Sequence, residues 1–429
     1  MRVIDILQGV QPSLGCTEPA AIALAAALAR QAVGGEVKRV AVSCDANVFK
    51  NALSAGIPGP GKLKGLLIAA GLGAIAGDPQ LRLEALSKVT SKDVRIVEGL
   101  LEAGFVTVEL KEGPRRLYIE AIVETDQGTG RAVIEDRHTN VTAVEANGQH
   151  LPLPNWVELG AVREESEGRD AALARMTLRE VLALVEEMTA EEIEYMLEGV
   201  RMNEAASRAG LTTRAGLGIG PSLADMIEEG LLADDLASRA EVLAASAVDA
   251  RMSGMRVPVM TSSHSGNQGI TAIMPVVTVA RELNVGDEEL AKAVATSHLI
   301  TAYIKAHLGN LSAMCAAYMA AGIGAAAGIV RLLGGEEEEI GRAISIMVGN
   351  VAGVICDGAK TGCALKVGTA ASLAVKCALL AMRGAQVPGS DGIVDETPER
   401  TVRNLGLVGD PGMVETDAQI LRIMLEKGK

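Results

Sequence analysis

Apolar and polar residues follow different periods in successive parts of the chain. Residues 17–34 form an Ala- and Leu-rich run with Pro19 in its first turn and glycines at its end, which predicts a buried helix. Between about residues 36 and 159, segments of alternating apolar and polar residues predict strands. Beyond about residue 165 nearly every segment has helical periodicity. The expected strands are 37–48, 105–110, 116–125, 130–136 and 140–146, and the helices between the first strand and the others are 62–76 and 92–103.

This order of elements predicts the α+β fold class. The chain has 429 residues, more than the ~250–300 at which a single hydrophobic core stops growing, so two domains are expected. We predict a mostly helical domain made of residues 1–35 and 160–429. Residues 36–159 are expected to form an inserted α+β domain that carries an antiparallel sheet.

The composition favours a core of small side chains. Hydrophobic residues make up 48% of the chain, but only one Trp, four Tyr and two Phe are present. Ala-rich helices can approach one another closely, and they are compatible with a homo-oligomer. The segment 308–330 has no charged residue and is long enough to cross a membrane. Its Ala, Gly, Ser and Met content predicts a buried helix instead.

Charge and the N-terminal residues limit the classes of partner. The formal net charge of −14 argues against a nucleic-acid partner, because such a partner requires a basic surface. Residues 1–5 contain an acidic residue and lack the basic and apolar segments of a secretory signal, so we expect a cytoplasmic protein with no membrane partner. In that reducing compartment the six cysteines are expected to be ligands, nucleophiles or buried thiols.

Four of the cysteines lie where chemistry is expected. Cys16 directly precedes the predicted helix, and a helix N-terminus lowers the pKa of a thiol because its free N–H groups favour the thiolate. Cys356 and Cys363 belong to a glycine-containing segment that predicts a loop, which can bring both sulfur atoms to one centre. With Cys315, three thiolates and a separate reactive cysteine suit a 4Fe-4S cluster with one open iron. The spacing alone leaves a second interpretation open, in which the three are buried thiols. Core positions are expected for Cys44 and Cys377.

Polar, Gly-rich loops are expected at residues 47–52, which lead into residues 56–61, and at residues 262–269, which precede a helix that begins near Pro275. Such turns can present backbone N–H groups to a carboxylate, but they match no phosphate-binding template, and a role as generic turns stays open. His264 lies in the second loop and is equally well explained as a hydrogen-bonded turn residue. His298 and His307 are expected on opposite sides of one helix, so a shared metal is not expected.

Short motifs distributed along the whole chain resemble the L-cysteine desulfidase family, which is related to the α domain of iron-sulfur L-serine dehydratases. The resemblance implies that L-cysteine is converted into pyruvate, ammonia and hydrogen sulfide by a 4Fe-4S cluster with one open iron, without pyridoxal phosphate. It also implies that the helical domain is the catalytic, cluster-binding domain. The motifs are Gly15-Cys16-Thr17-Glu18-Pro19-Ala20, Asn47-Val48-Phe49-Lys50-Asn51-Ala52, Gly56-Ile57-Pro58-Gly59, Ser265-Gly266-Asn267-Gln268-Gly269-Ile270 and Cys356-Asp357-Gly358-Ala359-Lys360.

The same resemblance assigns roles to individual residues. Cys16 is implied to be the base that removes the α-proton of a small amino-acid substrate. The cluster, implied to be bound by Cys315, Cys356 and Cys363, supplies a Lewis acid through its open iron. No role is implied for His264. The candidates for binding the carboxylate and ammonium groups are Thr17, Glu18, Lys50, Asn51, Asn267, Gln268 and Lys360.

Three other functions remain open at this point. An L-serine dehydratase could use the same site with hydroxide as the leaving group, because one contact to the β-substituent can reverse the preference. A non-catalytic sensor that binds an amino acid or a cluster would not need the reactive thiol of Cys16. A zinc protein with three cysteine ligands and a water would fit the number of ligands but not the family.

Overall fold

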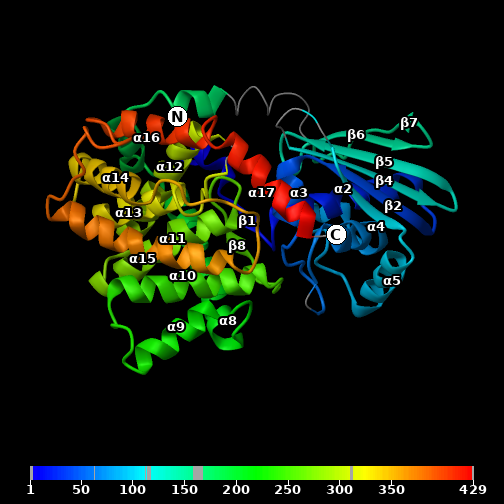
Figure 1. The fold of residues 1–429 in the computed structure, drawn as a ribbon, viewed down its shortest axis with the longest axis horizontal. Coiled ribbons are helices and arrows are strands. Elements are labelled where there is room, and N and C mark those ends of the chain that lie inside the picture. The colour runs from blue at the N-terminus through cyan, green and yellow to red at the C-terminus, as the bar shows by residue number, and fades with distance from the viewer. Residues whose placement is uncertain are drawn as a thin grey trace.

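Two parts lie side by side along the long axis of the molecule: a body of packed helices and a sheet covered by helices (Figure 1). Each part has its own hydrophobic core. This arrangement confirms the predicted α+β fold class. The structure is a computed structural model, and it describes residues 3–61, 63–111, 113, 117–157, 168–309 and 313–427.

The strands that the structure describes in this sheet follow the order β3-β2-β4-β5-β6-β7. The sheet is antiparallel as predicted, except that β2 and β3 are parallel. This pair is parallel because the chain leaves β2, passes through helices α3, α4 and α5, and returns in the same direction. The strands are β2 (Val37–Cys44), β3 (Val106–Leu110), β4 (Tyr118–Thr125), β5 (Gly128–Glu135), β6 (Val141–Ala146) and β7 (Gln149–His150).

The predicted N-terminal helix is α2 (Thr17–Val33), and its buried side chains share a core with the sheet. Small residues are required along this contact. A Cβ atom on Gly130 of β5 would lie 1.9 Å from the carbonyl oxygen of Ala29, so the two backbones touch. The domain boundary at residue 35 stays a prediction. Among the other helices of this part, α4 (Leu66–Ala76) and α5 (Ser91–Glu102) confirm the helices expected there.

The helical body is built around α13, whose residues from Ala320 to Val330 are buried. Glycines again allow close helix packing, since a Cβ atom on Gly324 would lie 2.4 Å from the carbonyl oxygen of Ser297 in α12. The helices of this body are α7 (Leu178–Glu186), α8 (Ala190–Thr213), α9 (Ile219–Glu228), α10 (Leu236–Met252), α11 (Gly266–Leu283), α12 (Asp287–Leu308), α13 (Ala320–Leu332), α14 (Glu337–Val351), α15 (Cys363–Met382) and α16 (Pro398–Gly409).

The predicted helix over residues 308–330 is shorter than expected. Residues 313–319 form a turn and a bridge, and the helix begins at Ala320. The prediction of a helix is therefore wrong for residues 313–319. Residues 310–312 lie outside the described residues. Apolar composition cannot separate a buried turn from a buried helix. In the described ranges one helix, α15, is long and apolar enough to cross a membrane, and 56% of its apolar window is buried inside the protein.

The last helix, α17 (Val414–Lys427), leaves the helical body and runs beside α3 (Ala46–Ala52) of the other part (Figure 1). We call α17 the C-terminal strap. Asp417 of the strap pairs with the buried Lys50 of α3, and Leu421 packs against the core of the sheet. The strap therefore fastens the two parts to each other from the end of the chain.

A small antiparallel pair of strands holds the N-terminal segment on the helical body. β1 (Pro12–Ser13) pairs with β8 (Val259–Met260), which lies between α10 and α11. The pairing places residues 14–16 beside the end of α10 and the start of α11. Two short elements precede β1 in the chain: α1 (Val3–Ile6) and the 3-10 turn Leu7–Gly9. A further 3-10 turn, Pro79–Glu84, follows α4.

Candidate functional site

Backbone pairing brings two of the predicted ligand cysteines together. Met314 and Ile355 form an isolated antiparallel bridge. The N–H of Cys315 donates to the carbonyl of Val354 (2.8 Å), and the N–H of Cys356 donates to the carbonyl of Ala313 (2.6 Å). The thiols of the two cysteines are consequently joined by a hydrogen bond.

The loop expected between Cys356 and Cys363 is present, and Cys363 is the first residue of α15. The Cys363 sulfur lies 3.8 Å from the carbonyl oxygen of Gly358 and interacts electrostatically with the two other thiols. Gly358 has a φ of +90°, and a Cβ atom there would lie 2.4 Å from the carbonyl oxygen of Lys50. The loop can therefore approach α3 this closely only with glycine at this position.

The two hydrogen-bonded thiols differ in their affinity for a proton. The hydrogen bond from Cys315, helped by the charges of Lys50 and Lys366, lowers the pKa of Cys356 to about 6 despite burial. The same hydrogen bond and burial raise the pKa of Cys315 well above its usual value. Burial also raises the pKa of Cys363. Cys356 is thus the thiolate of the group near neutral pH.

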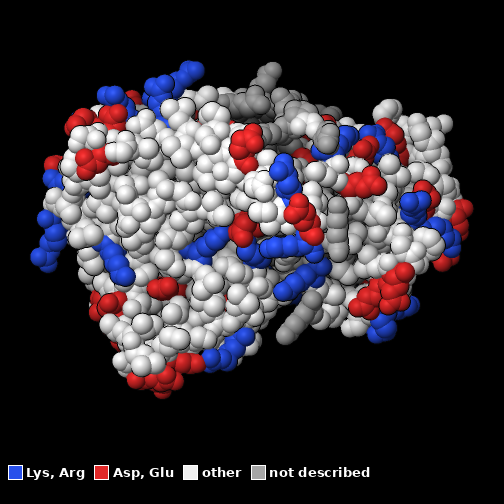
Figure 2. Space-filling model, viewed as in Figure 1, with Lys and Arg blue, Asp and Glu red and all other residues white. Residues whose placement is uncertain are grey.

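An iron-sulfur cluster is compatible with this donor set. The three cysteines are free, they interact with one another, and lysine charges lie beside them to offset thiolate charge. Figure 2 shows Lys and Arg side chains gathered over the junction of the two parts of the molecule. Within the described residues, no three His, Cys, Asp or Glu side chains already lie close enough to enclose a metal ion. The assignment of these cysteines as ligands stays a prediction.

Cys16 lies at the N-cap of α2 and is 5% exposed. Its sulfur is 3.0 Å from Oε2 of Glu18 and makes no capping hydrogen bond with the helix. Burial, followed by the charge of Glu18, raises the pKa of Cys16 well above its usual value, while Arg251 opposes this shift. The expectation of a pKa lowered by the helix N-terminus is therefore wrong, because the thiol faces a carboxylate in a buried place.

Glu18 connects several candidate residues. Its Oε2 accepts hydrogen bonds from Cys16 and from Thr17 Oγ1 (3.0 Å), and its Oε1 accepts one from Asn51 Nδ2 (3.0 Å). His138 Nε2 lies 3.9 Å from Oε1. Burial raises the pKa of Glu18, but His138 and these hydrogen bonds outweigh burial and hold its pKa below the usual value. Glu18 is thus an ionised hydrogen-bond acceptor for Cys16.

The helix α3 interacts both with Cys356 and with the Glu18 side chain beside Cys16. The sequence predicted a strand to residue 48 and a loop from residue 47, but the Asp45 side chain accepts from the N–H of Asn47 (2.8 Å) and starts a helix. Lys50 and Asn51 are consecutive residues of this helix. Lys50 acts on Cys356, and Asn51 holds Glu18 beside Cys16. Both sides of the site are therefore fixed by one short helix.

Residues 262–265 form a turn, as predicted, but the predicted loop does not continue to a helix near residue 275. The helix α11 begins at Gly266, so Asn267 and Gln268 occupy its first turn. A Cβ atom on Gly269 would lie 1.9 Å from the carbonyl oxygen of Met260. This glycine allows backbones to touch, which explains its position without a bound anion.

Two lysines assigned to substrate binding have partners within the protein. Lys50 is 3% exposed and pairs with Asp417 of the C-terminal strap. Lys360 Nζ lies 2.5 Å from Oδ1 of Asp357. These ion pairs place both lysines beside the cysteine loop rather than leaving them free.

Sequence reasoning missed Arg251, which ends α10. Its Nη1 donates to Oδ1 of Asn267 (2.8 Å), and its charge acts on Cys16. An arginine in the last turn of a helix is common, because positive charge is favourable there, so its position in the sequence gave no signal. Only the fold brings it to the site.

His264 and His298 lie near the start of α11. His264 has a φ of +64° and is exposed. His298 is 1% exposed, its Nδ1 lies 2.9 Å from Ser262 Oγ, and burial lowers its pKa to about 3. The imidazole of His298 is therefore neutral near neutral pH.

The buried His298 predicts a loss of stability in acid. Between its usual pKa of 6.5 and its folded value of about 3, the unfolded chain binds a proton that the folded chain does not. The free energy of unfolding therefore falls as the pH falls through this window, by about 1.4 kcal/mol per pH unit for one group. His298→Gln should remove this contribution to the slope of the free energy of unfolding against pH. The slope is measured by denaturant unfolding between about pH 5 and about pH 7. His150→Gln, with a side chain 81% exposed, should keep the slope of the unchanged protein. Equal slopes in all three proteins would contradict the prediction.

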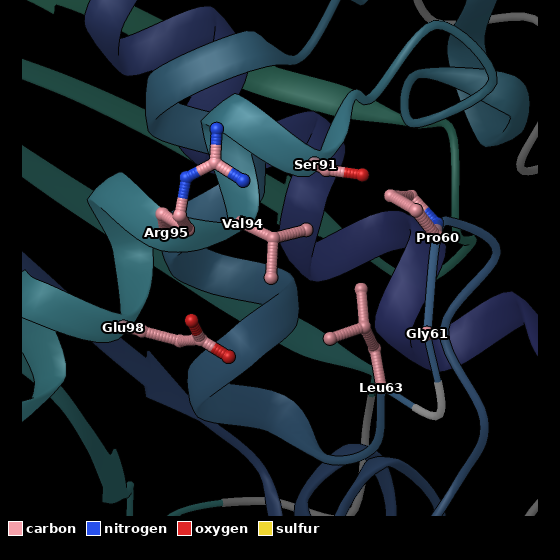
Figure 3. A pocket seen from close by; sticks show the side chains of 7 residues that line it. All are labelled: Pro60, Gly61, Leu63, Ser91, Val94, Arg95 and Glu98. Carbon is pink, nitrogen blue, oxygen red and sulfur yellow. The ribbon is translucent and has the colours of Figure 1, made fainter.

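A surface hollow of about 400 Å³ lies elsewhere, between α5 and the loop at residues 60–63 (Figure 3). Val94 and Leu63 line it together with Arg95 and Glu98. None of the cysteines or candidate substrate-binding residues belongs to its lining. We therefore place the candidate site at the cysteines and not in this hollow.

The chain is similar to known proteins over most of its length. The family model described as serine dehydratase alpha chain matches residues 88–422. A UPF0597 protein of Desulforapulum autotrophicum is 42% identical over 430 residues, which cover 99% of this chain and 97% of that protein. A UPF0597 protein of Clostridioides difficile is 40% identical over 98% of each chain. One of Aeromonas salmonicida is 41% identical over 97% of this chain and 94% of that protein.

Proposed function

Because this chain belongs to the serine dehydratase alpha chain family, which is associated with iron-sulfur clusters, we propose that it is a β-eliminating lyase that converts L-cysteine into pyruvate, ammonia and hydrogen sulfide. One observation carries the proposal. The thiols of Cys315, Cys356 and Cys363 interact with one another, and Lys50 of α3 acts on Cys356, while the neighbouring Asn51 bonds Glu18 beside Cys16. This connection through α3 supports a shared role for Cys16 and the three other cysteines.

We propose that Cys315, Cys356 and Cys363 hold a 4Fe-4S cluster. When bound, a cluster with an open iron would supply a Lewis acid for the leaving sulfur. The chain provides the compensating charge, since Lys50 and Lys366 both act on Cys356. Asp357, which bonds Lys366 Nζ at 2.6 Å, keeps that lysine at the loop.

The chain's own residues would move the protons. Cys16 donates its thiol hydrogen bond to Glu18, so transfer of that proton over 3.0 Å leaves a thiolate. Arg251 favours this thiolate, and Asn51 keeps Glu18 in place. The sulfur of Cys16 then takes the α-proton as the bond between the β-carbon and the substrate sulfur breaks. The substrate sulfur leaves as hydrosulfide, which takes the proton held by Glu18 to give hydrogen sulfide and restores the Glu18 carboxylate. The other product is aminoacrylate, which hydrolyses to pyruvate and ammonia.

An L-serine dehydratase is the second candidate, and the description of the matching family favours it. The same proton transfers would release water instead of hydrogen sulfide. A single contact to the β-substituent decides between the two substrates. We place L-cysteine first because of the motifs shared with desulfidases.

The cellular setting follows from the same proposal. An enzyme of this class would work in the cytoplasm on a small amino acid, without nucleic-acid or membrane partners. The net charge of −14 supports the absence of a nucleic-acid partner. A homo-oligomer is also part of the proposal.

The experiment is an anaerobic purification followed by measurement of iron, sulfide and the visible spectrum. Pyruvate is then assayed from L-cysteine and from L-serine. We expect a cluster and faster turnover of L-cysteine. Cys356→Ser should lose the cluster, whereas Cys377→Ser, at a buried cysteine of α15, should retain it. A cluster without pyruvate from either substrate would contradict the proposed activity.

A further inference from the structure

Arg251 is a buried charge without a counter-ion. It is 3% exposed, and among the described residues no Asp or Glu lies within ion-pair distance of it. Its Nε is buried and has no hydrogen-bond partner in the structure. A buried guanidinium is costly unless it is paired, so this position favours an anion.

The surroundings bond one nitrogen of the guanidinium, leave Nε without an acceptor and pack closely against the group. Its Nη1 is used by Oδ1 of Asn267 at 2.8 Å. A Cβ atom on Gly266 would lie 2.3 Å from Nε and 2.6 Å from Cζ, so any side chain there would displace the group. Gly266 is also the first residue of α11, whose cap Ser265 makes no side-chain hydrogen bond. An α-helix of this length adds partial positive charge at the same end.

Gln268, in the same first turn of α11, offers a hydrogen-bond acceptor instead of a donor. Gln268 is 7% exposed, and its Oε1 is buried without a donor. An unpaired donor on Arg251 and an unpaired acceptor on Gln268 therefore belong to the same buried region, joined through Asn267. A carboxylate would satisfy the first, and an ammonium group would satisfy the second.

We propose that Arg251 binds the α-carboxylate of a free α-amino acid and that Gln268 Oε1 accepts a hydrogen bond from its ammonium group. This inference rests on the proposed function and names the residues that select its substrate class. The charge of Arg251 also acts on Cys16, which places the ligand next to the base. A guanidinium suits this role because it can donate two parallel hydrogen bonds to one carboxylate.

The test uses L-alanine, which has both charged groups but no leaving group, and L-alaninamide, which lacks the carboxylate. Binding to the anaerobically purified holoprotein is measured by calorimetry. Arg251→Met should weaken L-alanine binding about 100-fold and leave L-alaninamide binding unchanged. Arg251→Lys keeps the charge without the two-point contact and should weaken L-alanine binding about tenfold. For L-cysteine, KM should rise in the same order.

Arg281→Met is the matched control, because this arginine lies at the opposite end of α11 with a side chain 57% exposed. It should bind L-alanine like the unchanged protein. Gly266→Ala retains the charge but displaces the guanidinium, so it should also weaken L-alanine binding. This variant and Arg251→Lys keep the inference testable if Arg251→Met does not fold.

The outcomes separate the two proposals. Equal L-alanine affinity and equal KM in Arg251→Met, Arg251→Lys and the unchanged protein would overturn the role of Arg251 while leaving the lyase proposal intact. L-alanine binding that depends on Arg251, in a protein that makes no pyruvate, would support the amino-acid site and overturn the lyase. If the unchanged protein neither binds L-alanine nor turns over L-cysteine, both proposals are overturned.

Discussion

Cys16→Ala should lower pyruvate formation from L-cysteine by about 10²–10⁴-fold, the range that a positioned base contributes. The iron and sulfide content of the purified protein should stay unchanged, because Cys16 is not one of the three cysteines proposed to hold the cluster. The pH profile gives a second signature. Burial and Glu18 raise the pKa of the Cys16 thiol, so turnover limited by its thiolate should increase with pH. Steady-state rates across the accessible pH range check both expectations.

Cys44→Ala is the matched control for this experiment. Cys44 is buried at the end of β2, and burial raises its pKa to about 12, so it is an inert thiol near neutral pH. Its alanine variant should retain the rate of the unchanged protein after correction for the folded fraction. Turnover by Cys16→Ala equal to that of the Cys44→Ala control would remove Cys16 from the mechanism.

Asp417→Ala should lower the free energy of unfolding by about 3–5 kcal/mol, the usual cost of leaving one partner of a buried ion pair alone. Its partner Lys50 has a side chain only 3% exposed, and that of Asp417 is 11% exposed. The variant leaves the ammonium buried between the C-terminal strap and α3. Chemical denaturation followed by circular dichroism measures the loss.

Glu415→Ala provides the comparison on the same helix. Glu415 is exposed and lies two residues before Asp417 in the strap. Its removal should change the free energy of unfolding by less than about 0.5 kcal/mol, as is usual for surface positions. Equal stability losses in the two variants would show that the Lys50–Asp417 pair does not fasten the strap.

Periodicity identified most elements of the fold, because amphipathic strands and long Ala-rich helices have clear patterns. The helices at 17–34 and 92–103 and the four later strands are present within a few residues. Local capping caused the errors. Asp45 begins a helix where a strand was expected to continue, and Gly266 begins α11 well before residue 275. Both starts depend on one or two residues, which a periodic pattern does not reveal.

The motifs predicted the neighbourhood of the site better than its electrostatics. Cys16, Glu18 and Asn51 do meet, although they come from separate motifs. The high pKa of Cys16 could not be predicted from its position before a helix, because burial and a facing carboxylate are properties of the tertiary structure. Arg251 was missed for the same reason. Its neighbour Asn267 comes from α11, which packs against α10, and Cys16 follows β1, which pairs with β8 between these two helices.

The position of the strap at the end of the chain has a consequence for biosynthesis. Lys50 and Asp417 are separated by 367 positions in the sequence, and Gly358 packs against α3 at the same place. During translation α3 is therefore made long before both the cysteine-bearing loop and the helix that secures its surroundings. Contacts of such high sequence separation form late in folding. Loading of any metal centre would then be a post-translational event, and a tag or truncation at the C-terminus would interfere with it more than one at an ordinary chain end.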